Sequence, residues 1–384
     1  MEYHFNYKLN LPDDRLCPPV QNRLNYIHWL HNLVDFTAGQ FPFDQDSEHE
    51  VIGLDVGTGC CSIYPLIGCA TRKNWKFLAT DTDEKNIQTA KQNVALNNLE
   101  SRIHIQQTSL NDPLLPLDKL GRENIDFTMC NPPFYSSHDE MEKSAAGKEH
   151  APSAVCTGAE TEMITPGGEV AFVTRMIDES RALANQVKWF TSMLGKLSSV
   201  ITLAQKLQDS GVGNYAVTEF VQGRTKRWAI AWSWQDRRPA MNVARAIPGF
   251  PKHLMPFPSD YIITLDAGTS VDAVDGALDQ HLDDLPMYWR KDESHATRLG
   301  FTEGNTWSRQ ARRKIQLAQA AGNPPSKPTK IPEHVAMGVR IQRYWLENER
   351  AVQLTISWIQ GMDQTIFESF CGMVKRIIGT KFQA

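Results

Sequence analysis

The most informative side chains belong to the run Asn131-Pro132-Pro133-Phe134, which follows a short apolar stretch at residues 125–130. Two consecutive prolines fix the local backbone and remove two N–H donors, so the loop presents carbonyl oxygens. The Asn131 side chain adds one more acceptor beside the Pro132 carbonyl. Two acceptors can hold both N–H groups of a planar amine and turn its nitrogen lone pair toward an electrophile, while Phe134 is placed to stack on the ring that carries the amine. The alternative is a rigid turn with an incidental aromatic residue.

A second group lies upstream, in Asp55-Val56-Gly57-Thr58-Gly59, where a predicted strand meets a predicted helix. Glycines at such a turn let the backbone approach a ligand closely and leave amide N–H groups unpaired. Position 62 is Ser, so the run is not the G-x-G-x-x-G of dinucleotide enzymes. Asp81 ends the next predicted strand, and a carboxylate there can accept two hydrogen bonds from ribose hydroxyls. The alternatives are a tight loop at the glycines and a helix cap at Asp81.

These groups need strands and helices to position them. Apolar runs predict strands at 51–56, 75–80, 103–107 and 125–130, with helices between them up to about residue 70 and over 83–97. The alternation favours βαβ units and a parallel sheet covered on both faces, which is an α/β fold. The pattern predicts a further strand at 169–174, a helix at 186–194 and a strand pair at 219–222 and 228–234. An amphipathic helix over 19–36 precedes them all.

The composition changes after residue 238, where the proline-rich segment 239–259 is the best candidate for a linker. We therefore expect a first domain at 1–238, with an N-terminal extension at 1–50, and a smaller α+β domain at 260–384. That second domain has predicted strands at 261–265, 337–347 and 352–359 and helices at 271–282, 307–321 and 364–378. Residues 1–238 carry 23 Lys and Arg against 29 Asp and Glu, while residues 239–384 carry 17 Lys and Arg against 15 Asp and Glu. The net charge is therefore negative in the first part and positive in the second.

Composition excludes several classes of protein. The 384 residues are 41% hydrophobic and 22% charged, as in globular proteins and unlike disordered chains. We expect no membrane span, because the sequence has no stretch of about 18 uninterrupted apolar residues. We expect no signal peptide, because the N-terminal residues lack an apolar run. Seven cysteines, without a CxxC pair, indicate reduced thiols inside the cell and no zinc site. The net charge of −4 argues against binding nucleic acid by bulk attraction.

In their order along the chain, the glycine run, Asp81 and the N-P-P-F run resemble the amino-group methyltransferases that use S-adenosylmethionine. More narrowly, the chain resembles the methyltransferase-like protein 16 family of RNA adenine-N6 methyltransferases, relatives of the bacterial large-subunit ribosomal RNA adenine-N6 methyltransferases. One departure is Cys156, where the family pattern has asparagine. The resemblance covers roughly residues 1–235 and rests on Arg23-Leu24-Asn25-Tyr26-Ile27-His28-Trp29, residues 54–59, Ile63-Tyr64-Pro65-Leu66, residues 77–81 and 130–134, Met193-Leu194-Gly195-Lys196, Thr218-Glu219-Phe220 and Gln222-Gly223-Arg224-Thr225.

The resemblance implies a Rossmann-like S-adenosylmethionine-dependent methyltransferase domain with an N-terminal helical extension. It implies that Asp81 binds the ribose of the cofactor, that Thr108 lies near its adenine and that Arg23 reaches its carboxylate. From the residues alone, Arg23 could equally be a solvated side chain on the first helix. The implied cofactor-binding residues are Arg23, Asp55, Gly57, Thr58, Gly59, Asp81, Thr108 and Asn131, and the implied catalytic residues are Asn131, Pro132, Pro133 and Phe134.

Three basic segments are candidates for contact with RNA, and each could instead be a solvated surface. They are the turn at 223–227, the charged loop at 136–150 and the predicted helix at 307–321. In the helix, three arginines at spacings i, i+3 and i+4 share one face. The candidate residues are Arg224, Lys226 and Arg227 in the turn, Lys143 and Lys148 in the loop, and Arg309, Arg312, Arg313 and Lys314 in the helix.

The combined expectation is transfer of a methyl group from S-adenosylmethionine to adenosine N6 in a structured RNA. The appended second domain favours U6 small nuclear RNA, with messenger RNA hairpins as further substrates, and a nuclear location, with the cytoplasm as the alternative. One rival is a glutamine-N5 methyltransferase of release factors, whose N-P-P-Y loop acts on a similar carboxamide. The other is a fold that binds RNA without catalysis.

Overall fold

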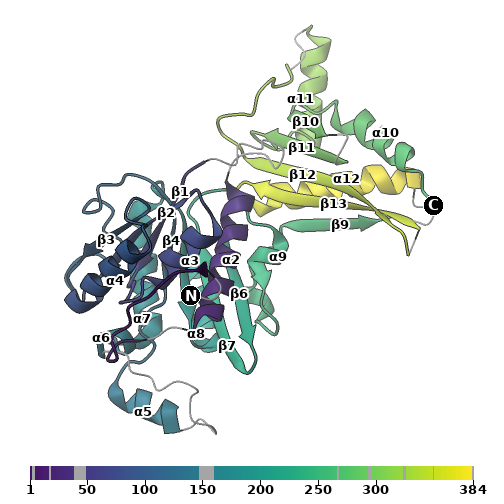
Figure 1. Ribbon diagram of the computed structural model, residues 1–384. Helices are drawn as coiled ribbons and strands as arrows, with labels where there is room; N and C mark the ends of the chain where they lie inside the picture. The colour runs from purple at the N-terminus through teal and green to yellow at the C-terminus, as the bar shows by residue number, and fades with distance from the viewer. Residues whose placement is uncertain are drawn as a thin grey trace. The chain divides into compact units, whose positions relative to one another are not determined.

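The computed structural model describes residues 1, 5–16, 19–38, 49–146, 160–265, 268–292, 296–322, 326–348 and 350–382. The chain forms two compact units (Figure 1). The first contains residues 1–235 and 242–256, and the second contains residues 236–241 and 257–384. Within the described ranges, no helix is long and apolar enough to cross a membrane.

The first unit is built on an eight-stranded sheet of order β3-β2-β1-β4-β5-β7-β6-β8. All neighbours in this sheet are parallel except β7, which runs antiparallel to both β5 and β6. The strands are β1 (Val51–Val56), β2 (Trp75–Asp81), β3 (Ile103–Gln107), β4 (Ile125–Cys130), β5 (Val187–Leu194), β6 (Tyr215–Gln222), β7 (Thr225–Trp232) and β8 (Arg245–Ala246).

Helices cover both faces of this sheet (Figure 1), as the strand–helix alternation predicts. Apolar residues of α7 and α8 share a core with Leu54, Leu78 and Phe190. On the other face, the Tyr26 hydroxyl of α2 lies 2.6 Å from the Thr191 hydroxyl of β5. The helices of this unit include α2 (Val20–Thr37), α3 (Ile63–Thr71), α4 (Glu84–Leu96), α5 (His138–Ala146), α6 (Glu160–Met163), α7 (Gly168–Ser180), α8 (Leu197–Asp209) and α9 (Met241–Ala244).

Two predicted elements in this unit are wrong, because tertiary burial overrides local pattern. Residues 169–174 were expected as a strand but begin helix α7, whose buried residues Val173, Met176 and Ile177 recur at helical spacing. Residues 186–194 were expected as a helix but form β5, between β4 and β7 in the middle of the sheet. Strand β5 is buried on both faces and therefore shows no alternation that would distinguish it from a buried helix.

The segment 239–259 differs from the expected linker, because both units use part of it. Ile247, Phe250 and Leu254 are buried in the core of the first unit. Just before them, Arg238 lies in the second unit, where its guanidinium stacks 4.0 Å from the Trp358 ring and its Nε donates to the carbonyl of Gly361. Pro248 lies in a turn of this segment, between the buried residues Ile247 and Phe250, so a proline-rich composition can also belong to packed chain.

The second unit is α+β. Its five-stranded sheet has the order β10-β11-β12-β13-β9, antiparallel throughout, with α10 and α12 sharing its apolar core. Strands β10 and β11 were not predicted, whereas α11 has no buried residue and matches the expected basic helix. The elements are β9 (Asp260–Thr264), α10 (Val271–Leu282), β10 (Tyr288–Asp292), β11 (Thr297–Thr302), α11 (Arg309–Ala320), β12 (Met337–Leu346), β13 (Ala351–Gln360) and α12 (Gln364–Phe382).

Candidate active site

The candidate binding and catalytic residues converge at the carboxyl ends of three adjacent parallel strands. Val56, the last residue of β1, pairs with Thr80 of β2 and with Cys130 of β4. Gly57, Asp81 and Asn131 directly follow these three paired residues. Carboxyl ends of strands in an open α/β sheet are where ligands bind. The structure therefore brings together the three motifs that the sequence places about 25 to 50 residues apart.

The glycine turn is fixed by the neighbouring strand. Gly57 and Gly59 have φ angles of +76° and +63°, a conformation that favours glycine. The amides of Gly57 and Thr58 both donate to the carbonyl of Thr80 at 2.9 Å. A Cβ atom at Gly57 would meet nothing within 4 Å, so this backbone borders open space in which a ligand can lie.

Asp81 connects this turn to helix α4. One carboxylate oxygen accepts the Gly59 amide at 2.8 Å and the other accepts the Asp83 amide at 2.9 Å. Burial raises the pKa of Asp81, and these two hydrogen bonds oppose the rise. The helix cap proposed as an alternative for Asp81 is made by Asp83, whose side chain accepts the Asn86 amide. Thr108 follows β3, and its amide donates to the Asp81 carbonyl at 2.9 Å.

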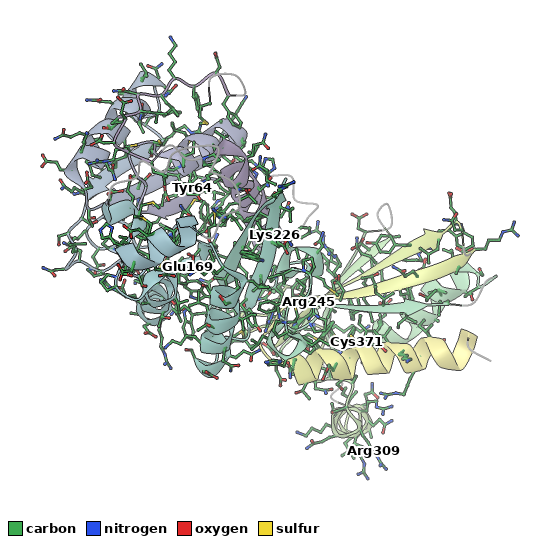
Figure 2. All side chains as sticks on the ribbon, turned by 90° about the horizontal axis from the view of Figure 1, so that it is seen from below. Tyr64, Glu169, Lys226, Arg245, Arg309 and Cys371 are labelled. Carbon is green, nitrogen blue, oxygen red and sulfur yellow. The ribbon has the colours of Figure 1, made fainter. Side chains whose placement is uncertain are left out.

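Two charged side chains are buried beside this turn without full compensation. Both carboxylate oxygens of Asp55 and the Nε of Arg23 lack a hydrogen-bond partner among the described residues. Burial raises the pKa of Tyr64, which is labelled in Figure 2. The charge of Asp55 adds to this rise and the charge of Arg23 opposes it, so both charged groups lie near the Tyr64 ring. Buried polar groups normally have partners, so this arrangement fits a ligand that carries both a carboxylate and an ammonium group.

We expect Asp55 to destabilise the ligand-free protein as the pH rises. Burial raises the pKa of Asp55 to about 7, above the value of about 4 for an exposed aspartate. Between these two values the folded state binds a proton that the unfolded state has lost, so stability falls with rising pH. The melting temperature of Asp55→Asn should therefore rise relative to that of the wild type as the pH goes from 4 to 7, by on the order of 5 °C. Above pH 7 the difference between the two melting temperatures should stay constant. Thermal unfolding scans across pH measure this, and a gap that is the same at pH 4 and pH 8 would contradict it.

The Asn131–Phe134 loop presents a buried hydrogen-bond acceptor. The Oδ1 atom of Asn131 is buried and has no hydrogen-bond partner in the described part of the chain. The chain is held just after the loop, because the Tyr135 amide donates to the Met163 carbonyl and the Thr165 amide donates to the Tyr135 carbonyl. A buried acceptor without a partner, on a fixed backbone, is ready to accept a donor from a ligand.

The basic candidates are distributed unevenly. Arg227 lies at the site, with its Cζ 5.7 Å from the centroid of the Phe134 ring. Lys226 forms a 2.6 Å ion pair with Glu219, and Arg224 is exposed at the hairpin turn. Lys143 lies in α5, whereas Lys148 and Cys156 are outside the described residues. The basic residues of α11, Arg309, Arg312, Arg313 and Lys314, are exposed, and Figure 2 shows the Arg309 helix in the second unit.

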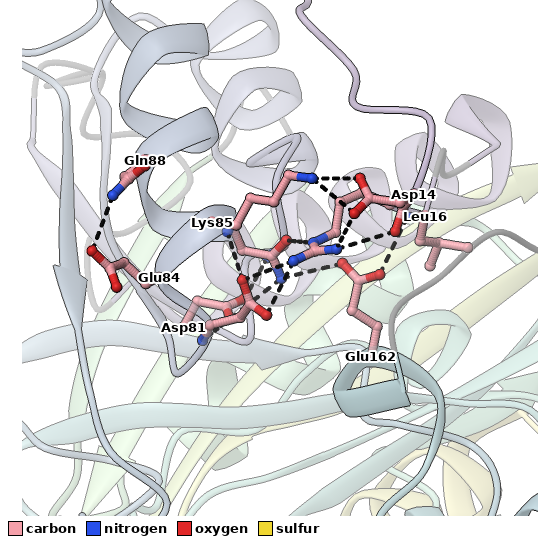
Figure 3. Close-up of polar contacts among 11 residues, drawn as sticks. Asp14, Leu16, Asp81, Glu84, Lys85, Gln88 and Glu162 are labelled. Atoms are coloured by element: carbon pink, nitrogen blue, oxygen red, sulfur yellow. Dashed lines mark hydrogen bonds and ion pairs between the residues drawn. The ribbon is translucent and has the colours of Figure 1, made fainter.

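The sequence does not predict a network of hydrogen bonds, called here the polar bracket, in which Arg15 and Glu162 hold the start of α4 (Figure 3). Arg15 donates from Nη2 to Asp83 and from Nε to Asn86, at 3.2 Å and 2.9 Å. Glu162 of α6 accepts the Asn86 amide group at 3.2 Å and the Leu16 backbone amide at 3.2 Å. These pairs join residues at least 68 positions apart, so no local pattern signals them. The bracket stabilises the loop that carries Asp81.

An open sheet of this order, with a glycine turn, an acidic strand end and an N-P-P-F loop at adjacent carboxyl ends, defines a Rossmann-like methyltransferase. The sequence pattern of a family described as RNA methyltransferase matches residues 1–236. The chain belongs to this RNA methyltransferase family. Among the described residues, no group of three or more His, Cys, Asp and Glu side chains could hold a metal ion.

Relatives and a solved structure agree with this family. The U6 small nuclear RNA (adenine-(43)-N(6))-methyltransferase of Schizosaccharomyces pombe is 36% identical, over 98% of this chain and 91% of its own length. The RNA N(6)-adenosine-methyltransferase METTL16 of Homo sapiens is 41% identical, over 60% of this chain and 41% of its own. The hMettl16 catalytic domain in complex with MAT2A 3'UTR hairpin 6 matches with a TM-score of 0.53 and 38% identity, over 61% of this chain and 78% of that chain.

Proposed function

We propose that the protein transfers a methyl group from S-adenosylmethionine to adenosine N6 in a structured RNA, and that U6 small nuclear RNA is its main substrate. The observation that carries this proposal is the buried Oδ1 of Asn131, which has no hydrogen-bond partner among the described residues and belongs to the residue just before Pro132. The name of the S. pombe relative, whose similarity includes the second unit, supports the choice of RNA. A U6 substrate also implies a nuclear location for the protein.

The buried charges fit the cofactor. Arg23 would hold its carboxylate, Asp55 would lie near its ammonium group, the Gly57–Gly59 backbone would line its methionine part and Asp81 would bind its ribose. Thr108 would lie near its adenine, because it follows the strand next to Asp81. When bound, the cofactor supplies a methyl group that its positively charged sulfur has already activated.

The protein's own part in the transfer is to position the target base. Asn131 Oδ1 and the Pro132 carbonyl would accept the two N–H groups of the adenine amine and turn its lone pair toward the methyl group. Phe134 would stack on the base, which offsets part of the few kcal/mol needed to remove it from an RNA stack. The product ammonium is acidic and can lose its proton afterwards, so the attack itself needs no strong general base. Positioning of this kind can supply most of the rate enhancement.

Transfer of tritium from labelled S-adenosylmethionine tests the proposal. Purified U6 RNA should become labelled at one adenosine N6, and a purified release factor should not. Label in the release factor alone would favour glutamine-N5 methylation, for which the shared N-P-P loop is the supporting observation. Cofactor and RNA binding without label in either substrate would indicate a non-catalytic RNA-binding protein.

The remaining basic residues are proposed to contact RNA without reading its sequence. Arg224, Lys226 and Arg227 lie on the hairpin that reaches the site, and Lys143 and Lys148 lie on the segment that follows the N-P-P-F loop. In the second unit, the exposed face of α11 would contact phosphates through its arginines. Each contact of this kind adds affinity and makes binding sensitive to salt.

Replacing Arg309, Arg312 and Arg313 of α11 by glutamine should weaken RNA binding and flatten its salt dependence. Each phosphate contact contributes about 0.7 to 0.9 to the slope of log K against log salt, so three lost contacts should lower the slope by about 2 to 3. The core should not change, since α11 has no buried residue. Lysine at the same three positions is the matched control. An unchanged slope in the glutamine variant would show that α11 does not bind RNA.

A truncation that removes the second unit should leave cofactor binding intact while it reduces RNA affinity. The cut belongs after Pro256 and not after Arg238, because residues 242–256 pack in the first unit. Full RNA affinity with the original salt slope after this truncation would assign the second unit another role.

A further inference from the structure

The first unit contains a buried carboxylate that none of the proposed steps uses. Glu169 lies in the first turn of α7 and is only 3% exposed (Figure 2). Its Oε2 accepts the Gly195 amide at 2.7 Å and its Oε1 accepts the Lys196 amide at 3.2 Å. Burial raises the pKa of Glu169, and hydrogen bonds from Ser199 and from these two amides oppose the rise. A buried carboxylate is costly unless it is hydrogen-bonded, so these bonds hold the turn between β5 and α8 firmly.

The turn that Glu169 holds lies directly against Phe134. A Cβ atom on Gly195 would be 3.0 Å from Cδ1 of the Phe134 ring and 3.3 Å from Oε2 of Glu169. The backbone of Gly195 therefore packs against one side of the Phe134 ring. Only a residue without a side chain fits at position 195 without displacing the ring. Arg227 also contacts this ring, and the negative charge of Glu169 opposes the lowering of the Arg227 pKa that burial causes.

A second connection runs from the same turn to the chain just after Phe134. The Lys196 ammonium forms a 2.6 Å ion pair with Glu140. Glu140 in turn accepts the Ser136 backbone amide at 2.8 Å and its hydroxyl at 2.6 Å. These contacts hold the pKa of Glu140 down at about 2. The Gly195–Lys196 turn thus touches the Phe134 ring through Gly195 and fixes Ser136 through Lys196.

We propose that Glu169 is a positioning residue for methyl transfer: by holding the Gly195–Lys196 turn, it sets the place of the Phe134 ring on which the target base stacks. This inference rests on the proposed function, because it assumes that an adenine lies on Phe134. Glu169 touches neither substrate nor cofactor in this scheme. It acts on the rate through the geometry of the aromatic ring, and small displacements of a positioned reactant lower rates strongly.

The test is Glu169→Gln in the full chain, with initial rates measured over a range of U6 RNA and cofactor concentrations. The amide keeps the shape of the side chain but replaces one acceptor by a donor that faces a backbone N–H. We expect kcat to fall by at least about tenfold, with cofactor affinity unchanged within about twofold. Asp178→Asn is the matched control on the same helix, because Asp178 is exposed and pairs only with Lys206 in the described contacts.

Gly195→Ala is the second variant: it places a Cβ 3.0 Å from the Phe134 ring while the carboxylate at position 169 is retained, although the same Cβ also lies 3.3 Å from Oε2 of Glu169. It should lower kcat in the same way, and the double variant should be less impaired than the product of the two single effects predicts, since both act on one ring. If Glu169→Gln loses thermal stability, Gly195→Ala still tests whether this turn sets the position of the Phe134 ring, and an unchanged kcat in Gly195→Ala would overturn the proposal. A wild-type enzyme that labels RNA, together with variants that keep more than half its kcat, would overturn the role of Glu169 and leave the proposed function intact. A wild-type protein that does not label adenosine would overturn both.

Discussion

Replacing Asn131 by alanine is expected to reduce methyl transfer to RNA by at least about a hundredfold, the usual effect of losing one preorganised polar contact at a reacting centre. The substitution removes an acceptor that is buried and has no other partner in the described residues, so no hydrogen bond to that oxygen within the described part of the chain is lost. Pro132 would then hold the amine alone, and the lone pair would no longer be directed at the methyl group. Initial rates with labelled cofactor and saturating RNA measure the effect.

Cofactor binding separates this result from a general loss of structure. The affinity for S-adenosylmethionine, measured by calorimetry, should change far less than the rate. Asn242→Ala is a matched control, because Asn242 belongs to the same unit and is exposed. An Asn131→Ala enzyme with more than about half the wild-type rate would show that the loop does not hold the target amine.

Asp81→Ala is expected to weaken cofactor binding by roughly 2–3 kcal/mol, or about 30- to 150-fold, as for the loss of a charge-assisted pair of hydrogen bonds. Both oxygens of Asp81 already accept a backbone amide. Oδ2 accepts only the Gly59 amide among the described contacts and has a second lone pair for a ribose hydroxyl, whereas Oδ1 also accepts a long 3.5 Å bond from the Asn86 side-chain amide, which a second ribose hydroxyl would replace. The substitution therefore removes contacts to the ligand and also releases the Gly59 turn.

RNA affinity measured without cofactor should hardly change in the Asp81→Ala protein, which separates the two ligands. Thr80→Val is a useful comparison, because Thr80 supports the same turn through its backbone carbonyl, which valine retains. Unchanged cofactor binding in Asp81→Ala, measured by calorimetry, would rule out Asp81 as the ribose ligand.

The sequence alone predicted the strand-end motifs, and the structure brings them together as expected. Gly57, Asp81 and Asn131 each follow a strand that is recognisable from its apolar run. Parallel strands place all such ends at one edge of the sheet, so this part of the site follows from local pattern and one topological rule. The N-terminal helix and the helices of the second unit were also predicted close to their observed bounds, because their apolar spacing is regular.

Tertiary structure decided the rest, since the interactions that matter there join residues distant in sequence. Burial at the centre of the sheet made 187–194 a strand, although its composition also suits a helix. Packing of Ile247 and Phe250 on the first unit, and of Arg238 on Trp358, decided where the units divide. The contacts of Glu169 with Gly195 and of Arg15 with Asp83 span 26 and 68 residues. Such contacts depend on how elements pack, and the periodicity of a sequence carries information only about each element's own exposed and buried faces.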